Sequence, residues 1–204
     1  MIICMSEIMC VTNRRLCRED FLTRMEAVAA AAPAGVILRE KDLAPDDYRV
    51  LAQQALAICR VHATPCIFHS FPQIALELGA DGLHLPLPLL RTLSPEEREK
   101  FPLLGASCHS VEDAQEAERL GCTYITAGHI FATDCKKGLP PRGLSFLREV
   151  CRTVQIPVWA IGGIEPENFL SVMATGAQGG CVMSGLMTCS NPKVLLQKFH
   201  TASA

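Results

Sequence analysis

Residues 157–183, PVWAIGGIEPENFLSVMATGAQGGCVM, contain a short apolar run, a helix-like segment and a second short apolar run. The runs Pro157–Ile161 and Gly180–Met183 are almost continuously apolar, as in parallel strands that helices cover. Between them a helical pattern runs from Pro166 to Thr175, and glycines at 176–180 follow it. Proline favours the first turn of a helix and glycine its end, so the stretch predicts one β-α-β unit.

The same unit recurs along the chain. Strands are expected at Ile2–Val11, Gly35–Arg39, Pro65–His69, Gly82–Leu85, Leu103–Ala106, Thr123–Ala127, Pro157–Ile161 and Gly180–Met183. Helices are expected near Glu19–Ala32, Pro45–Val61, Phe71–Leu78, Ser94–Lys100, Val111–Leu120, Leu144–Thr153, Pro166–Thr175 and Pro192–His200. Joints rich in glycine (78–82, 120–122 and 176–180) alternate with joints that contain proline (64–65, 101–102 and 156–157). This alternation indicates a repeated βαβα array.

Eight such units predict an α/β protein with one domain, a (β/α)8 TIM barrel over residues 1–204. A doubly wound sheet is the alternative, but no G-x-G-x-x-G loop follows the first strand. In a TIM barrel the chemistry lies at the carboxyl ends of the strands. The candidate site residues are therefore sought there.

Composition excludes several classes of protein. The 204 residues are 49% hydrophobic and 20% charged, with 19 Lys and Arg against 21 Asp and Glu. This near balance argues against a nucleic-acid clamp or a basic membrane anchor. No apolar run reaches the roughly 18 residues that a membrane-spanning helix needs, so no membrane association is expected. The eleven cysteines form no C-x-x-C pair, which favours buried free thiols and a cytoplasmic location over disulfides or a zinc site.

Charged residues follow the second predicted strand. Arg39 and Lys41 come directly after an apolar run, and alternation would place both on one strand face, pointing into the barrel mouth. Two cations at that place suit an anionic substrate. The alternative is a solvated charged loop.

The loop after the sixth predicted strand is the least ordinary stretch, GHIFATDCKKG at 128–138. His129 is placed at the mouth among polar residues, where an imidazole is suited to acid-base chemistry. Lys136 lies on the same loop. Cys135 beside two lysines could have a lowered pKa, although no base is evident nearby.

Glycines open the loops after the seventh and eighth predicted strands. Gly162 and Gly163 precede a helix, and Met183-Ser184-Gly185 follows the last strand. Such loops expose backbone N–H groups to a phosphate, and a phosphate site after strands seven and eight is common in TIM barrels. Simple tight turns are the alternative. Strand ends three and four, His69-Ser70 and Leu85-Pro86-Leu87-Pro88, carry no carboxylate, so we expect no metal.

Several phrases together resemble the thiamine phosphate synthase/TenI superfamily. They are Leu38–Lys41, Gly79–Leu85, Gly105–Ser107, Gly128–Lys137, Ala160–Ile164 and Met183–Gly185. The synthases of this superfamily use magnesium to join a pyrimidine pyrophosphate to a thiazole phosphate. Their pattern has Gln, Asn-Asp and Gly-Gln-x-Asp where this chain has Ile37, His69-Ser70 and Pro86–Leu89, and Gly-Pro where it has Gly128-His129. The stretch from Gly128 resembles instead the TenI branch, the thiazole tautomerases.

The resemblance implies a bacterial isomerase of thiamine biosynthesis that aromatises a carboxythiazole phosphate without a cofactor. His129 would be its acid-base catalyst. By the same resemblance Gly163, Met183 and Ser184 would contact the thiazole phosphate, Thr133 and Lys136 would line its pocket, and Arg39, Lys41 and Ser107 occupy mouth positions.

Two alternatives stay open from the sequence: a thiamine phosphate synthase, and a regulatory relative that binds a metabolite without turnover. The expected partner is a small thiazole phosphate, with no nucleic acid; a homo-oligomer is compatible with the sequence, which does not define the oligomeric state.

Overall fold

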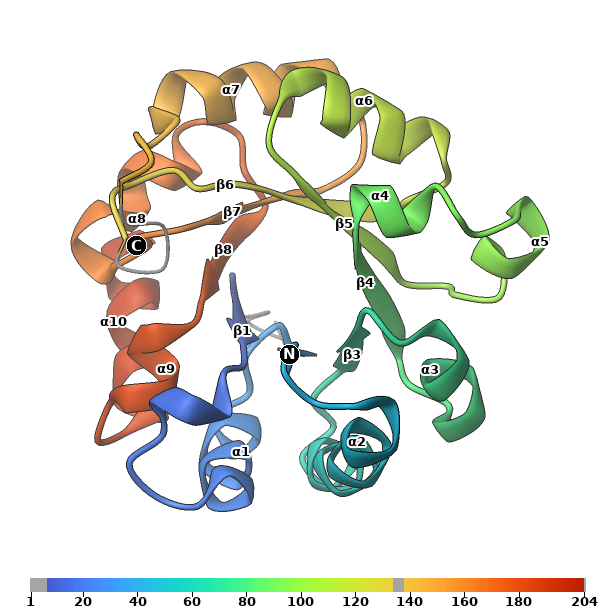
Figure 1. Ribbon diagram of the computed structural model, residues 1–204. Coiled ribbons are helices and arrows are strands. Elements are labelled where there is room, and N and C mark those ends of the chain that lie inside the picture. Colours follow the sequence, from blue (N-terminus) through green and yellow to red (C-terminus); the bar gives the residue numbers. More distant parts are fainter. Residues whose placement is uncertain (1–6, 134–137, 204) are drawn as a thin grey trace, which may run out of the picture.

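Eight parallel strands close into a barrel in chain order in the computed structural model, which describes residues 7–133 and 138–203 (Figure 1). The strands are β1 (Ile8–Val11), β2 (Gly35–Leu38), β3 (Cys66–His69), β4 (Gly82–Pro86), β5 (Leu104–Cys108), β6 (Tyr124–Gly128), β7 (Val158–Ile161) and β8 (Gly179–Val182). The closed β1–β8 pairing, with Met9 opposite Cys181, excludes the open doubly wound sheet. The predicted (β/α)8 barrel is confirmed.

Helices surround the barrel (Figure 1). They are the 3-10 helix η1 (Arg14–Leu16) and the α-helices α1 (Phe21–Ala30), α2 (Pro45–Val61), α3 (Pro72–Leu78), α4 (Leu87–Leu90), α5 (Pro95–Arg98), α6 (Val111–Arg119), α7 (Gly143–Thr153), α8 (Pro166–Met173), α9 (Ser184–Thr188) and α10 (Pro192–Ser203). The caps read from the sequence are present: Ser94 accepts from the Glu97 N–H at 3.2 Å and Ser110 from the Asp113 N–H at 3.0 Å. Each satisfies a backbone donor that the first helical turn leaves unpaired.

The structure differs from the sequence prediction in the first strand and in the short helices, including η1. The first strand, predicted from Ile2, is observed from Ile8, and residues 2–6 lie outside the described part of the chain. The short helices α4 and α9 were not predicted, since their sequences read as loops. In α4 the proline at position 88 occupies the first turn, where the missing N–H costs nothing.

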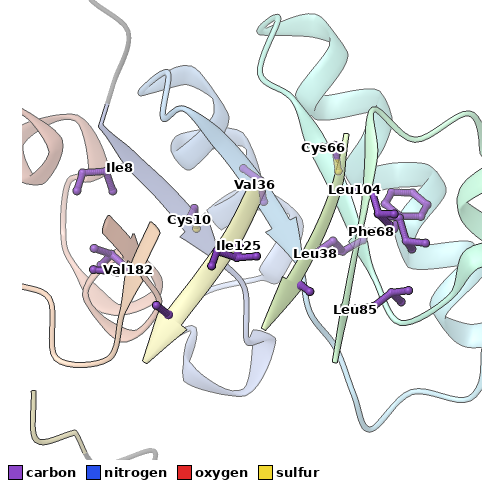
Figure 2. Close-up of a cluster of buried hydrophobic side chains, with 14 of the residues drawn as sticks. Ile8, Cys10, Val36, Leu38, Cys66, Phe68, Leu85, Leu104, Ile125 and Val182 are labelled. Carbon is purple, nitrogen blue, oxygen red and sulfur yellow. The ribbon is translucent and has the colours of Figure 1, made fainter. Parts of the chain in front are cut away.

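Outward-facing strand residues form most of the core between the barrel and its helices. Ile8, Cys10, Val36, Leu38 and Phe68 alternate with inward-facing neighbours and are buried under the helix layer (Figure 2). At about 25 cal/mol per Å², each large side chain buried here contributes about 1.5–3 kcal/mol. Because these residues face the helices, the alternate residues of each strand face the barrel interior.

A smaller apolar cluster fills the barrel interior. Its buried members are Met9, Val11, Ile37, Ile67, Tyr124, Trp159 and Cys181. Gly105 leaves room for the ring of Tyr124, because a Cβ at position 105 would overlap that ring. The interior is therefore filled by side chains, so a ligand is expected at the carboxyl ends of the strands, as in other TIM barrels.

The nine cysteines within the described residues are all free thiols, and six of them are buried. Burial raises the pKa of Cys181 to about 12, so this thiol is uncharged at neutral pH. Among the helices of residues 7–133 and 138–203, none is long and apolar enough to cross a membrane.

Candidate active site at the carboxyl end of the barrel

A layer of polar side chains lies above the apolar interior, toward the carboxyl ends of the strands. His69, two residues after the interior residue Ile67, lies beside His84 in register. Ser107 and Thr126 continue the layer on β5 and β6, where they are paired. Both histidines are buried, with 4% and 2% of their surface exposed. We call these four residues, His69, His84, Ser107 and Thr126, the floor of the site.

Hydrogen bonds hold the floor in one arrangement. The ring of His84 is bonded through Nδ1 to the Tyr124 hydroxyl and through Nε2 to Ser107 Oγ, both at 2.9 Å. His69 Nδ1 lies 2.7 Å from Ser70 Oγ, and the two imidazole rings stack with centroids 5.9 Å apart. Both nitrogens of His84 are thus occupied by hydroxyl groups, which suits a neutral imidazole with one donor and one acceptor.

Burial and nearby cations keep both histidines uncharged. Desolvation, with the charges of Arg39 and Lys41, lowers the pKa of His84 from 6.5 to about 3. The same causes, together with the neighbouring His84, lower the pKa of His69 to about 2. The floor therefore stays neutral at pH 7.

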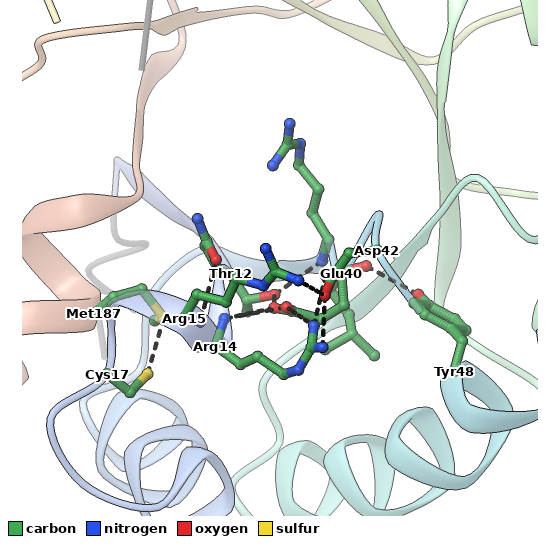
Figure 3. A network of polar contacts seen from close by, with 11 residues as sticks. Thr12, Arg14, Arg15, Cys17, Glu40, Asp42, Tyr48 and Met187 are labelled. Atoms are coloured by element: carbon green, nitrogen blue, oxygen red, sulfur yellow. Dashed lines mark hydrogen bonds and ion pairs between the residues drawn. The ribbon is translucent and has the colours of Figure 1, made fainter. Parts of the chain in front are cut away.

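A charged rim stands beside this floor, formed by residues 39–42 after β2. Arg39 is half-buried and its N–H donates to Thr12 Oγ1 at 2.9 Å, while Lys41 is exposed. Between them Glu40 is buried, and Figure 3 shows it meeting Thr12 and Arg14 from the β1 side of the barrel. We call residues 39–42 the cationic rim, because its acids are paired with Arg14 and Arg15.

The loops after β6 and β7 pack backbone against backbone. Ile130 N donates to Ile161 O at 2.9 Å and Phe131 N to Gly162 O at 3.0 Å. Gly163 has φ +65°, and a Cβ there would lie 2.7 Å from Ala132 O. Glycine is therefore required at position 163 by both conformation and space.

The predicted site residues fall into three groups around the mouth. Arg39 and Lys41 form the rim, and Ser107 belongs to the floor. A third group lies along the ends of β6 to β8: His129, Thr133, Gly162, Gly163 and Met183, all half-buried, with Ser184 exposed at the first position of α9. His129 Nε2 lies 3.4 Å from Leu139 O rather than in the floor. Lys136 and Cys135 lie outside the described residues. The roles given to these residues stay predictions.

Three residues of the floor, His69, His84 and Thr126, were not among the predicted site residues. His69 was noted only for the absence of a carboxylate, and His84 only as part of a family phrase. Their alternation with interior residues was a signal: His69 follows Ile67 and Thr126 follows Tyr124 by two positions.

Comparisons with known proteins agree with this architecture. The family model described as thiamine monophosphate synthase matches residues 8–186. The chain belongs to this family. Thiamine-phosphate synthase of Roseiflexus sp. (strain RS-1) is 36% identical over 201 residues, which cover 95% of this chain and 84% of that protein. Thiamine-phosphate synthase 2 of Streptococcus pneumoniae serotype 4 is 36% identical over 93% of this chain and 91% of its own.

A solved structure gives the same family. Thiamine phosphate pyrophosphorylase from Pyrococcus furiosus superposes with a TM-score of 0.83 at 27% identity, over 97% of this chain and 95% of that one. The two sequence relatives are named as synthases and the solved structure as a pyrophosphorylase; none of the three is named as a tautomerase. The prediction of an isomerase that aromatises a carboxythiazole phosphate is therefore wrong, and with it the TenI assignment. The phrase after Gly128 and the departures at Ile37, His69-Ser70 and Pro86–Leu89 favoured the tautomerases, whereas the similarity over the whole chain is to synthases.

The described residues do not fit the magnesium ion that the superfamily's synthases use. Among residues 7–133 and 138–203, no group of three or more His, Cys, Asp or Glu side chains is placed to hold a metal ion. Glu40 and Asp42, the acids that follow β2, are engaged by Arg14. A hard divalent ion prefers carboxylate oxygens, whereas this floor offers imidazole and hydroxyl groups.

Proposed function

We propose that the chain is a transferase of the thiamine-phosphate synthase type. It would join a pyrimidine that carries a pyrophosphate to a thiazole that carries a phosphate, releasing pyrophosphate. The relatives at 36% identity support this reaction over isomerisation. The observation that carries the proposal in the structure is the neutral floor next to the cationic rim.

An uncharged heteroaromatic ring with an anionic tail matches that arrangement. The floor presents His69, His84 and Ser107, whose hydrogen-bonding atoms carry no net charge at neutral pH. A neutral ring meets donors and acceptors there without the cost of burying a charge. The pyrophosphate tail would then extend over the rim toward Arg39 and Lys41.

The cations of the rim would also favour the chemical step. When the bond between pyrimidine and pyrophosphate breaks, the leaving group gains negative charge. Fixed positive groups stabilise charge that develops in the transition state more than they stabilise the substrate. Arg39 and Lys41 would do this without any proton transfer.

The thiazole phosphate would bind on the β6–β8 side of the mouth. The backbone of Gly162 and Gly163, with Met183 and Ser184, offers polar groups without a charged side chain, and Thr133 lies on the adjoining loop. The two anionic tails would then be held at different places, which keeps them apart while the rings meet over the floor. This separation is what a two-substrate coupling needs.

Direct assay tests the proposal. The purified protein, incubated with the pyrimidine pyrophosphate and the thiazole phosphate, is expected to release pyrophosphate and form thiamine phosphate, both quantified by chromatography. Omission of either substrate is the control. Tight binding of both substrates without product would instead support a metabolite-binding relative, which the departures at Ile37, His69-Ser70 and Pro86–Leu89 favour as the second candidate.

A further inference from the structure

A buried carboxylate separates the two cations of the rim. Glu40 lies between Arg39 and Lys41, yet only 2% of its surface is exposed. It accepts a hydrogen bond from the Thr12 hydroxyl at 2.7 Å and from the backbone N–H of Arg14 at 3.0 Å (Figure 3). The Arg14 guanidinium completes the set, with Nη1 3.1 Å from Oε2. A buried carboxylate is stable only with such partners, and here all of them come from the segment after β1.

The same segment holds the rim at two further points. The Thr12 hydroxyl donates a hydrogen bond to Glu40, and its oxygen accepts one from the backbone N–H of Arg39 at 2.9 Å. Arg14 also binds both oxygens of Asp42 at 2.6 Å, and Arg15 reaches Asp42 at 2.8 Å. Residues 39, 40 and 42 are therefore each bonded to one or more of residues 12–15, and each bond joins residues 26 to 28 positions apart in the chain.

Lys41 lies between Glu40 and Asp42, which are both paired with Arg14. The backbone N–H of Arg39 is bonded to Thr12. The charges of Lys41 and Arg39 reach the floor, since they contribute to lowering the pKa of His69 and of His84. Long cationic side chains on a free loop would lose conformational entropy each time they bound an anion. Hydrogen bonds and ion pairs at three residues already order the backbone of this loop, so anion binding has to order only the side chains of Arg39 and Lys41.

We propose that Glu40 is a positioning residue, which anchors the rim to Thr12 and Arg14 so that Arg39 and Lys41 are held ready for the pyrophosphate group of the substrate. The inference rests on the proposed function for the identity of that substrate. The positioning role itself concerns only where Arg39 and Lys41 are held, whichever anion they bind.

Glu40→Gln tests the inference, because the amide keeps the size of the side chain and removes its charge. The affinity for inorganic pyrophosphate, measured by calorimetry, is expected to fall roughly 10-fold, as for the loss of one charge-assisted contact. In turnover the KM for the pyrimidine pyrophosphate should rise, while the KM for the thiazole phosphate stays unchanged. A residue that only supported the fold would shift both KM values together.

Glu116→Gln is the matched control. Glu116, on the helix layer, is ion-paired with an arginine as Glu40 is, here through two contacts: Arg91 Nε and Nη2 lie 2.7 and 2.6 Å from its oxygens. This variant should bind pyrophosphate as the parent does. If Glu40→Gln fails to fold, Asp42→Asn takes its place, because it releases the second anchor at the exposed end of the rim; its pyrophosphate affinity is expected to fall in the same direction.

The outcomes separate the two proposals. A folded Glu40→Gln or Asp42→Asn protein with parental pyrophosphate affinity, or a parent that does not bind pyrophosphate, overturns the positioning role. Weakened binding in the variants together with no thiamine phosphate from the parent overturns the proposed function and leaves the positioning role standing. Rescue by Glu40→Asp, which restores the charge on a shorter chain, should be partial.

Discussion

The floor and the cationic rim lie at the same mouth of the barrel, but their buried ionisable groups are stabilised in opposite ways. His69 and His84 are buried and lose their charge, so their hydrogen bonds to Ser70, Ser107 and Tyr124 are made between neutral groups. Glu40 is buried to the same extent and is enclosed by donors instead. Burial alone thus does not decide the electrical character of a site; the partners that the fold brings to each group do.

The rim is expected to give the largest effect on activity. Lys41→Met removes a cation that lies outside every described strand and helix, so kcat/KM for the pyrimidine pyrophosphate should fall roughly 10- to 100-fold. Lys100→Met, which removes an exposed lysine after α5 at the other end of the barrel, is the control and should behave as the parent. Equal activity of the two variants in a pyrophosphate-release assay would show that the cationic rim does not contribute to substrate binding or turnover.

Substitutions beneath the floor are expected to lower the free energy of unfolding. Gly105→Ala places a Cβ into the space of the Tyr124 ring, which must move and break its bond to His84. Overpacking of this kind costs about 1–3 kcal/mol, to be read from urea unfolding. Gly121→Ala separates crowding from backbone preference, because its Cβ would meet no atom within 4 Å although φ is +89°. A larger loss at Gly121 than at Gly105 would contradict the packing argument.

The free energy of unfolding should depend on pH in a way that reflects the two neutral histidines of the floor. The folded pKa of each histidine lies below the unfolded value of 6.5, so the unfolded chain binds more protons as the pH falls below 6.5. The free energy of unfolding is therefore highest above pH 6.5 and falls as the pH decreases, by roughly 1 kcal/mol per pH unit for each histidine. His84→Gln should make this slope shallower between pH 6.5 and 5. An unchanged slope would mean that folding does not lower the pKa of His84, which would contradict a neutral floor.

Magnesium should give the smallest effect. With no cluster of metal-binding side chains among the described residues, 1 mM Mg²⁺ is expected to raise the free energy of unfolding by about 0.1 kcal/mol or less, as for a dissociation constant above about 10 mM. Thermal unfolding with Mg²⁺ and with EDTA measures the difference. A clear, saturable stabilisation by Mg²⁺ alone would show a metal site that the floor and rim do not account for.

Much of the architecture followed from local sequence. The apolar runs, the capping serines at 94 and 110, and the glycine and proline joints each report on a few neighbouring residues, and these suffice to count eight βα units. Placing Arg39 and Lys41 near a strand end followed in the same way. The choice of reaction did not, because one loop resembled the tautomerases while the whole chain matches the synthases.

The character of the site depended on the tertiary structure. In the sequence, Arg39-Glu40-Lys41-Asp42 is four charges in a row, and His69 and His84 lie fifteen residues apart on separate segments. Barrel closure brings Thr12 and Arg14 to Glu40, and strand register sets His69 beside His84 above Tyr124. The order of strands and helices follows from the sequence alone, because that order depends on local patterns. Only the folded barrel decided which charges are neutralised, which are paired and which face the substrate, because those outcomes depend on burial and on partners far away in the chain.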